Sequence, residues 1–209
     1  MPSLNQREYL GAAITSVLGQ APEDTELIVM DGGSTDGSVD LLADLAAQHP
    51  GRVRWFSGPD EGPAQAVNAA LRHARAPIIG WLNSDDLYAP GAMERACAYL
   101  FERPECVMVY GQGEHVDASG RTLGRYPTLP PSTPLAAFSD GCFICQPTAF
   151  FRRDAVIELG GLDGGLRTAF DFDLWLRLFK AFPDRVGFID ELQACSRLHP
   201  GRSEEHTSE

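Results

Sequence analysis

The segment Ile78-Ile-Gly-Trp-Leu-Asn-Ser-Asp-Asp86 changes abruptly from apolar residues to two adjacent carboxylates. Its apolar part is typical of a buried strand. The strand cannot continue through the acidic end, because an ionised Asp is costly to bury without a partner. We therefore expect the carboxylates at the carboxyl end of the strand, where open α/β sheets bind ligands. Two acidic oxygen donors there suit a divalent cation and a phosphate-bearing substrate. A helix-capping loop before Pro90 is the alternative interpretation.

The composition is that of an ordinary globular domain. With 209 residues, 44% of them hydrophobic, the chain is long enough for one domain with a substantial core. The net charge of −12 argues against nucleic acid or an anionic membrane as the main partner. No apolar run approaches the length of a membrane span, no signal peptide is evident, and the five cysteines lack disulfide-framework spacing. We expect a cytoplasmic protein without an integral membrane segment, able to work at the inner face of the membrane.

Helix and strand patterns alternate through the first half, which predicts a mostly parallel sheet flanked by helices. Asn5 followed by Glu8 predicts a capping box for the first helix. A short apolar strand over 26–30 ends at Asp31, and Ser34 is predicted to begin the second helix. The same patterns predict strands over 52–56 and 107–110 and helices over 63–74 and 90–101.

The pattern changes after Gly111. A hairpin is predicted over 114–126, a proline-rich connector over 128–134, a strand at 150–151 and a helix over 171–182. We interpret residues 1–201 as one domain, with the halves 1–111 and 112–201 on the same sheet. The sequence opens at a helix-entry loop, so we expect the first strand of the sheet to be missing. Residues 202–209 have no apolar periodicity and are expected to be a non-native or disordered tail.

Acidic residues follow further predicted strands. Asp31 precedes Gly32 and Gly33, and glycines allow a ligand to approach the backbone closely. Asp60 leads into Gly62 after the next strand. Asp31 could accept hydrogen bonds from a base or a ribose, although Asp-Gly-Gly-Ser-Thr-Asp is also a plain turn and cap. Because several such acids end strands on one sheet edge, they favour a ligand site.

Taken together, these segments resemble the family 2 glycosyltransferases, which have the GT-A (Rossmann-like) nucleotide-sugar-binding fold. The resemblance extends from Pro2 to about His199. It rests on the order and spacing of segments 2–6, 16–20, 26–38, 60–62, 81–86 and 169–177.

The resemblance implies a site for a nucleoside diphosphate sugar. Asp31 matches the carboxylate that binds the base, Asp85 matches the acid near the ribose, and Asp86 matches the metal ligand of the DxD-type motif. His199, in a late Arg-x-His element, is a second candidate metal ligand for Mg²⁺ or Mn²⁺. The remaining predicted donor-binding residues are Pro2, Ser3, Asn5, Ser34, Asp60, Gly62, Asn68 and Asn83.

The resemblance also implies the reaction, an inverting sugar transfer. Asp171 corresponds to the catalytic base, which would take the proton from an acceptor hydroxyl. The family usually has Glu before this Asp, whereas this chain has Phe170. Asp173 is expected to be structural, since residues two apart face different sides of a helix. The acceptor is expected to be a glycan, a lipid-linked molecule or another hydroxyl compound.

Two alternatives remain open at this stage. A sugar-phosphate nucleotidyltransferase also uses acidic residues and Mg²⁺, but it would be expected to carry a Gly-rich, Arg/Lys-containing loop early in the chain, which 2–7 does not show. The other is a truncated, inactive nucleotide-sugar-binding remnant.

Overall fold

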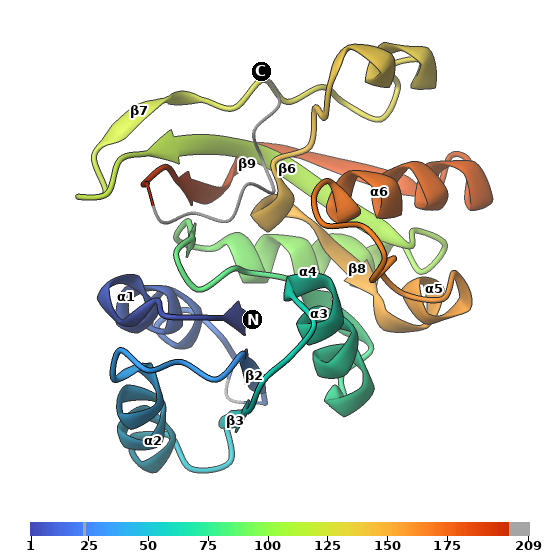
Figure 1. Ribbon diagram of the computed structural model, residues 1–209. Helices are drawn as coiled ribbons and strands as arrows, with labels where there is room; N and C mark the ends of the chain where they lie inside the picture. Colours follow the sequence, from blue (N-terminus) through green and yellow to red (C-terminus); the bar gives the residue numbers. More distant parts are fainter. Residues whose placement is uncertain (23, 201–209) are drawn as a thin grey trace.

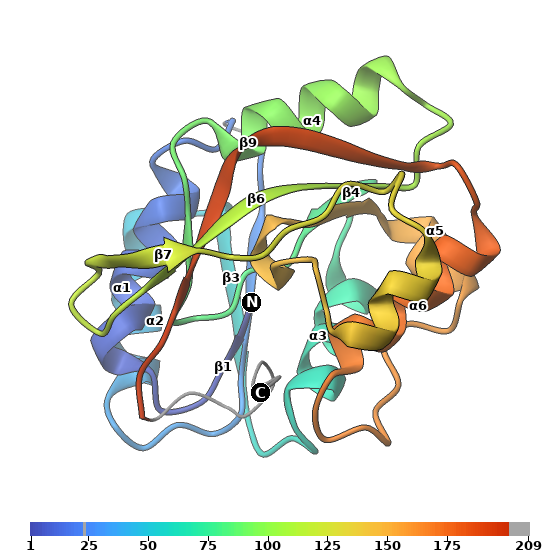
Figure 2. The same ribbon diagram turned by 90° about the horizontal axis from the view of Figure 1, so that it is seen from above.

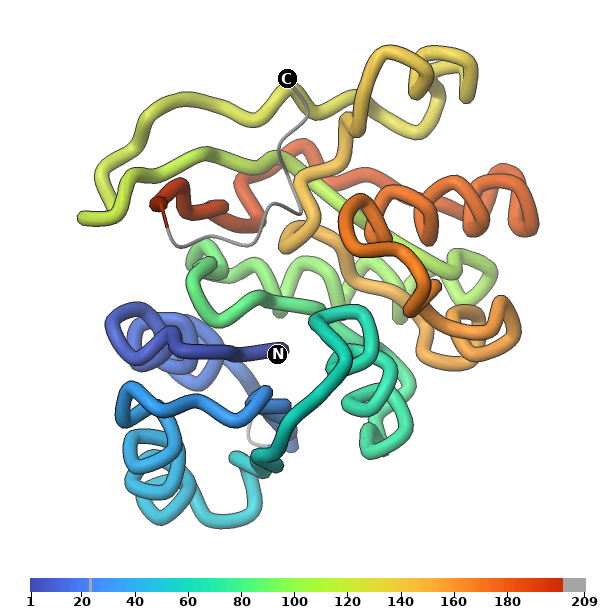
Figure 3. The backbone as a smooth tube through the Cα atoms, viewed as in Figure 1, coloured from blue at the N-terminus to red at the C-terminus, as the bar shows by residue number. Residues whose placement is uncertain are grey.

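The computed structural model describes residues 1–22 and 24–200, which form an α/β fold with two sheets and flanking helices (Figures 1 and 3). The segment 202–209, expected from the sequence to be a tail, lies outside these residues. The helices are α1 (Arg7–Leu18), α2 (Ser38–Gln48), α3 (Pro63–His73), α4 (Ala92–Glu102), α5 (Arg153–Glu158) and α6 (Phe170–Ala181). Short 3₁₀ helices η1 (Leu135–Asp140) and η2 (Gln146–Thr148) lie between them. Within these two ranges, none of the helices has both the length and the apolar character that a bilayer crossing requires.

The smaller sheet is parallel and has the order β1 (Pro2–Ser3), β2 (Leu27–Asp31) and β3 (Val53–Ser57). Helices α1 and α2 lie on one side of it and α3 on the other (Figure 1). Because the strands run the same way, Asn5, Asp31 and Asp60 all follow carboxyl ends of strands at one edge. This arrangement confirms the parallel sheet flanked by helices that the alternating pattern predicts.

The larger sheet is mixed. Its order is β4 (Ile78–Gly80), β8 (Phe150–Arg152), β6 (Met108–Val116), β9 (Val186–Arg197) and β5 (Leu87–Tyr88), with β7 (Thr122–Arg125) beside β6. Only β6 and β9 are parallel to each other; the other pairs are antiparallel. Figure 2 shows the long β6 and β9 side by side beneath α4. The C-terminal end of β9 is thereby carried next to β5 and the acidic segment before it.

The apolar core has two parts. One lies between the smaller sheet, α1, α2 and α4, and the other is packed around α3, α5, α6 and the larger sheet. Trp175, Tyr110, Phe150, Phe151 and Phe170 are among the largest fully buried side chains. Apolar burial of this kind dominates the folding free energy. Each of the two clusters contains residues from both halves of the chain, so the halves share their core.

Several predictions from the sequence are wrong. The strands form two sheets rather than one, because β4 pairs with β8 and not with β1. The second half does share the larger sheet with β4, β5 and the start of β6, which come from residues 1–111. A first strand is present as Pro2–Ser3, which pairs in parallel with Met30 and Asp31. The capping box is absent, because Asn5 binds the loop after β2 through its backbone N–H and its side-chain oxygen. Helix α2 begins at Ser38 rather than at Ser34, because the Asp36 carboxylate accepts from the N–H of Ser38.

The predicted elements of the second half are mostly confirmed. The hairpin forms from β6 and β7, with its turn closed by Asp117, whose backbone N–H donates to Arg121 O at 2.9 Å. Strand β8 and helix α6 lie within a residue of their predicted starts. The strand ahead of the acidic segment ends earlier than predicted, at Gly80, although Trp81 and Leu82 remain buried.

We predict that Gly111→Ala destabilises the protein by about 1–3 kcal/mol, because overpacking a close contact forces the backbone to move. A Cβ atom at Gly111 would lie 2.6 Å from the backbone oxygen of Ile189, in the β6–β9 pairing that carries β9 to the acidic segment. Gly58→Ala is the control, since a Cβ atom there has nothing within 4 Å. Urea denaturation measures the unfolding free energy of both variants. Equal stability of the two variants would contradict the prediction.

Candidate functional site

The loop after β2 is organised by the Asp31 carboxylate. Asp31 is buried, and its Oδ2 accepts hydrogen bonds from the N–H of Gly33 at 3.1 Å, from the N–H of Ser34 at 3.0 Å and from the hydroxyl of Ser57 at 2.7 Å. The Ser34 hydroxyl donates to Oδ1. The sequence pattern therefore forms both a turn and a fixed carboxylate at the end of the strand.

These donors determine the charge state of Asp31. Burial by itself would raise the pKa of this carboxyl group, but the hydrogen bonds from Ser34, Ser57 and Gly33 outweigh it and lower the pKa below its usual value. Asp31 is thus held as a carboxylate. A carboxylate has about four lone-pair sites, two on each oxygen, so Oδ1 retains capacity for a further donor.

Asn5 joins the end of β1 to this loop. Its backbone N–H donates to the Ser34 hydroxyl at 2.8 Å, and its side-chain oxygen accepts from the N–H of Thr35 at 2.9 Å. The backbone of Asn5 has φ = 52°, a left-handed conformation that Asn tolerates better than most residues. Pro2 and Ser3 are buried in β1, and Ser3 contributes its backbone oxygen to the N–H of Gly32 at 2.9 Å.

Asp60 and Gly62 lie beside the same loop. The Asp60 carboxylate is close enough to Gly32 that a Cβ atom there would stand 3.2 Å from Asp60 Oδ2. Asp60 Oδ1 accepts from the N–H of Gly62 at 2.9 Å, and Asp60 is exposed. The structure therefore brings together the predicted residues Asn5, Asp31, Ser34 and Asp60.

The two adjacent carboxylates point to different partners. Asp85 Oδ2 lies 3.0 Å from His199 Nε2. Asp86 is 2% exposed, and its Oδ1 accepts the backbone N–H of Arg197 at 2.8 Å. Asp85 therefore faces the imidazole, whereas Asp86 fastens the end of β9 to the acidic segment.

Arg197 holds the acidic segment against the turn between β6 and β7. Its Nε donates to the backbone oxygen of Asp85 at 2.8 Å, and its Nη1 donates to the oxygens of Asp117 at 3.1 Å and Ala118 at 2.9 Å. The guanidinium also lies over the ring of Tyr9, 4.9 Å from its centroid. Because Arg197 is buried and its donors are used in this way, it supports the backbone of the site.

A cavity of about 560 Å³ lies between the start of α1, the loop after β2 and the segment after β9. Asn5 and Tyr9 line it from the end of β1 and the start of α1, and His199 lines it from the segment after β9. The rings of Tyr9 and His199 are 4.6 Å apart between centroids. The loop after β2 reaches this hollow through Asp36, and the Asp85–His199 pair reaches it through His199; Asp31 and Asp85 themselves do not line it.

Two predicted donor-binding residues have structural partners. Asn68 donates to the backbone oxygen of Leu162 at 2.8 Å and accepts its N–H at 2.9 Å, which holds the glycine-rich loop before α6. Asn83 accepts from Trp81 Nε1 at 3.0 Å and donates to Gln146 Oε1 at 3.0 Å. Sequence reasoning missed Gln146, because only the fold brings this buried amide to the acidic segment.

Asp171 and Asp173 have different surroundings in α6. Asp171 is 4% exposed at the start of α6, and its Oδ1 accepts the N–H of Phe172 at 2.8 Å. Burial, and to a smaller extent the Asp171 charge, raises the pKa of Cys142 to about 12. The pKa of Tyr126 is raised by burial, then by Cys142 and Cys145, and to a smaller extent by Asp171. Asp171 therefore lies near both groups. Asp173 instead forms an ion pair with Arg177 at 2.7 Å.

Few potential metal ligands lie together at Asp85 and His199. Within residues 1–22 and 24–200, no cluster of three or more His, Cys, Asp or Glu side chains forms a potential metal site. A carboxylate oxygen and an imidazole nitrogen are nevertheless both metal ligands, and their 3.0 Å separation suits adjacent positions on one ion. Two ligands at about 2.1 Å in adjacent octahedral positions lie about 3.0 Å apart, and Mg²⁺ sites commonly take further ligands from water and phosphate.

The fold matches that of GT-A enzymes. The sequence profile of the family described as "Glycosyl transferase family 2" matches residues 1–160, and the chain belongs to this family. Chondroitin synthase of Escherichia coli is 29% identical over 183 residues, which cover 88% of this chain and 26% of that protein. An uncharacterized glycosyltransferase of Nostoc is 30% identical over 202 residues, 93% of this chain and 62% of that protein.

Solved structures show the same fold. Staphylococcus aureus TarS 1–349 in complex with UDP-GlcNAc superposes with a TM-score of 0.77 at 18% identity, over 97% of this chain and 58% of that one. The mannosyltransferase PcManGT of Pyrobaculum calidifontis, in complex with GDP-Man and Mn²⁺, has a TM-score of 0.72 at 20% identity, over 97% and 56%. The chain thus spans from about a quarter to about three fifths of the length of these relatives.

We predict that Asp31→Asn lowers the free energy of unfolding at pH 7 by about 1–3 kcal/mol, because the buried donors around Asp31 lose their charged acceptor. The folded-state pKa of Asp31 is lowered. Its stabilising effect is therefore fully present above the unfolded pKa of about 3.9 and is lost as the pH falls through the folded pKa.

Urea unfolding at pH 7 and at pH 3 measures the difference in unfolding free energy between wild type and Asp31→Asn. This difference should be smaller at pH 3. Asp44→Asn, at an exposed position of α2, is the control and should change stability by less than about 0.5 kcal/mol. A difference between wild type and Asp31→Asn that is the same at both pH values would contradict the prediction.

Proposed function

We propose that the protein transfers a sugar from a nucleoside diphosphate sugar to an acceptor hydroxyl, with inversion at the anomeric carbon. The observation that carries this proposal is the Asp85–His199 pair, 3.0 Å apart beside the loop of Asp31, in a chain of glycosyl transferase family 2. TarS and PcManGT were solved with UDP-GlcNAc and GDP-Man, so a nucleotide sugar is the donor class we propose here.

On the donor side, the free capacity of Asp31 Oδ1 supports a role as acceptor for an N–H of the base. Asn5, Ser34, Asp60 and Gly62 adjoin this carboxylate and are proposed to line the nucleotide site. Asn83 and Asn68 are proposed to act indirectly, because their amides hold Gln146 and Leu162. Pro2 and Ser3 would place Asn5.

For the cation, we propose Asp85 and His199 as the ligands of Mg²⁺ or Mn²⁺, with Asp86 as the residue that positions them. This differs from the sequence-based prediction, in which Asp86 was the ligand and Asp85 the ribose contact. The reason is geometric, since Asp85 faces His199 and Asp86 accepts from Arg197. When bound, the ion would neutralise the diphosphate of the leaving nucleotide.

For the acceptor, we propose Asp171 as the general base. Its carboxylate would take the proton of the acceptor hydroxyl while that oxygen attacks the anomeric carbon. The bond from this carbon to the diphosphate breaks, and its electron pair leaves with the nucleoside diphosphate. The transition state has oxocarbenium character, so fixed charges around it contribute to the rate. Cytoplasmic localisation, including work at the inner membrane face, remains part of this proposal.

The function is tested by a screen of nucleotide sugars for hydrolysis and transfer to glycan and lipid-linked acceptors, with and without Mn²⁺. We expect release of nucleoside diphosphate with one or a few donors. Asp171→Asn should lower kcat by about 10²–10⁴-fold and leave the KM for the donor unchanged, because it removes only the base.

Asp173→Asn is the matched control in that screen. This change breaks the ion pair with Arg177. It should lower the stability of the protein and have a smaller effect on kcat. Pyrophosphate release from a sugar phosphate and a nucleoside triphosphate would instead indicate a nucleotidyltransferase. Donor binding without any turnover would favour the inactive remnant.

The metal assignment is tested by thermal shift with Mn²⁺. We predict that Asp85→Asn abolishes the Mn²⁺-dependent rise in Tm, whereas Asp86→Asn lowers the Tm itself and keeps the response to Mn²⁺. The reason is that Asp86 holds Arg197, while Asp85 faces the imidazole. The reverse result would restore Asp86 as the metal ligand.

A further inference from the structure

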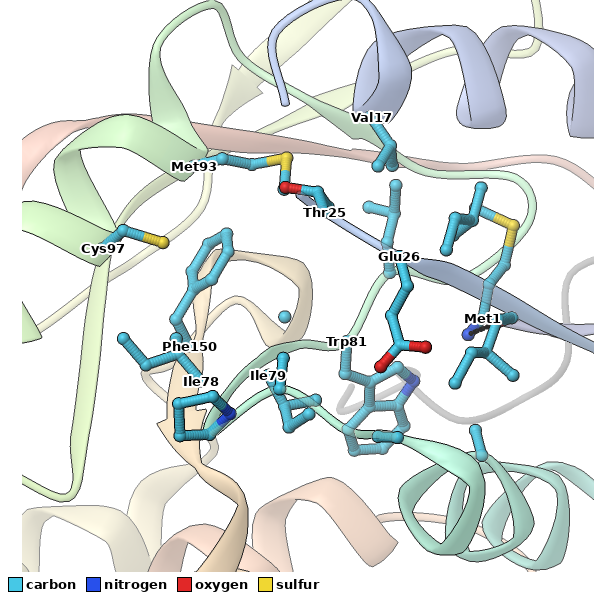
Figure 4. Close-up of a pocket in the computed structure, with 18 of the residues that line it drawn as sticks. Met1, Val17, Thr25, Glu26, Ile78, Ile79, Trp81, Met93, Cys97 and Phe150 are labelled. Atoms are coloured by element: carbon cyan, nitrogen blue, oxygen red, sulfur yellow. Dashed lines mark hydrogen bonds between the residues drawn. The ribbon is translucent and has the colours of Figure 1, made fainter. Parts of the chain in front are cut away.

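A closed loop of hydrogen bonds ties the acidic segment to the buried amide of Gln146. Trp81 Nε1 donates to Asn83 Oδ1 at 3.0 Å, Asn83 Nδ2 donates to Gln146 Oε1 at 3.0 Å, and Gln146 Nε2 donates to the Trp81 carbonyl oxygen at 2.7 Å. Trp81 and Gln146 are each 2% exposed. Figure 4 shows the Trp81 ring at the edge of a pocket of about 440 Å³, whose wall also includes Ile78 and Ile79. Because the loop starts and ends on Trp81, it fixes both the backbone and the ring of this residue.

The two ends of this loop determine the orientation of each amide. An indole N–H can only donate a hydrogen bond, and a peptide carbonyl oxygen can only accept one. Asn83 therefore turns its oxygen to the indole and its NH₂ group to Gln146, and Gln146 turns its own NH₂ group to the Trp81 carbonyl oxygen. A side chain at position 146 that lacks either a donor or an acceptor breaks the loop and leaves buried polar groups unpaired.

The ring that the loop holds packs against the start of α6. The rings of Trp81 and Phe170 are stacked, with centroids 5.7 Å apart and planes 15° apart. Phe170 is 1% exposed and is the first residue of α6, directly before Asp171. Stacked aromatic pairs have preferred geometries. The place of the Trp81 ring therefore constrains the place of Phe170 and of the carboxylate that follows it.

Two features of the chain at this point agree with such a constraint. Ala169 has φ = 57°, a left-handed conformation that persists at a residue other than Gly only where the surrounding structure holds it. Position 170 carries Phe, whereas the resemblance to family 2 glycosyltransferases leads us to expect Glu there. A Glu side chain would lose the stack with Trp81 and would bury a charge. The aromatic residue thus suits a contact that an acid could not make.

Asn83 brings the donor side of the site into the same loop. Its carbonyl oxygen accepts the backbone N–H of Asp86 at 3.3 Å, which closes the turn that carries Asp85. One network of hydrogen bonds and stacked rings therefore extends from the turn of the acidic segment to the start of α6.

We propose that Gln146 is a positioning residue for the general base. Acting through Trp81 and Phe170, its amide sets the position of the Asp171 carboxylate relative to the acidic segment. This inference rests on the proposed function, in which Asp171 takes the proton of the acceptor hydroxyl. The reacting groups have to be aligned closely, because a displacement of about 1 Å costs about a hundredfold in rate.

The test compares two buried glutamines. Gln193 is 0% exposed, and its side chain accepts one hydrogen bond, from Arg95 Nε at 2.8 Å, and donates one, to Ala92 O at 3.2 Å. Gln146 likewise accepts one and donates one. Gln146→Met and Gln193→Met therefore remove matched sets of buried hydrogen bonds at nearly constant volume. We expect both changes to lower Tm, so stability alone does not separate them.

Hydrogen exchange measured by NMR separates them without any need for activity. The N–H of Phe172 donates to Asp171 Oδ1 at 2.8 Å, so its exchange reports whether this carboxylate stays in place. Gln146→Met should speed the exchange of this amide proton and of the Trp81 indole proton by at least about tenfold, and Gln193→Met should leave both unchanged.

A second pair of variants serves if Gln146→Met does not fold. Trp81→Phe keeps an aromatic ring and removes the indole N–H that begins the loop. Trp175→Phe is its control, because Trp175 is buried in the same aromatic cluster and lies 6.4 Å from the Trp81 ring. Trp81→Phe should speed the exchange of the Phe172 amide proton by at least about tenfold, whereas Trp175→Phe should not.

Kinetics show whether Gln146 acts through the base. With the donor that the wild type uses, Gln146→Met should lower kcat by about tenfold to a hundredfold. In an Asp171→Asn background the same change should lower kcat by less than about threefold, because residues that act as a unit have non-additive effects. Gln193→Met should have the same small effect in both backgrounds.

The outcomes distinguish this inference from the proposed function. Equal Phe172 exchange in Gln146→Met and Gln193→Met would overturn the inference, whatever the turnover. An equal loss of kcat from Gln146→Met in the wild-type and Asp171→Asn backgrounds would overturn it as well. Faster Phe172 exchange in Gln146→Met, in a protein that turns over no nucleotide sugar, would contradict the proposed function and support the link from Gln146 to Asp171.

Discussion

The end of the last strand is held against the acidic segment by one buried residue, Arg197, and the site depends on this contact. Its backbone N–H binds the Asp86 carboxylate, and its side chain binds backbone oxygens of Asp85, Asp117 and Ala118. These bonds join the acidic segment, the β6–β7 turn and, through the ring of Tyr9, the first helix. A buried guanidinium needs such partners, because its desolvation is costly. His199 follows two residues later and is thereby delivered to Asp85.

The contact explains how much of the site the sequence could predict. The cost of burying an unpaired charge predicted that the apolar strands ending in Asp31 and in Asp85–Asp86 would place these carboxylates on one side of the fold. The sequence could not predict which of the two adjacent carboxylates faces a ligand. Neighbouring side chains point in different directions, and the direction of each is fixed by a partner more than a hundred positions away, Arg197 for Asp86 and His199 for Asp85. No local pattern carries that information.

The same limit applies to the amides. Asn68 and Asn83 have the residue type of a sugar-binding side chain, but each is used to hold a distant segment. Their partners, the backbone of Leu162 and the side chain of Gln146, lie 94 and 63 positions away. Local patterns served better for elements, since the alternation of helix and strand predicted the parallel sheet and the hairpin. Helix starts were less predictable, because Asp36 and Asn5 each bind across loops and so override the simple cap pattern.

The short strand β1 connects the smaller sheet to the loop of the site. Strand β1 ends at Ser3, and Asn5 directly after it contacts Ser34 and Thr35 beside the Asp31 carboxylate. A two-residue strand paired on one edge has few hydrogen bonds to resist local opening. Any motion of β1 therefore reaches Asn5 and the loop that it holds.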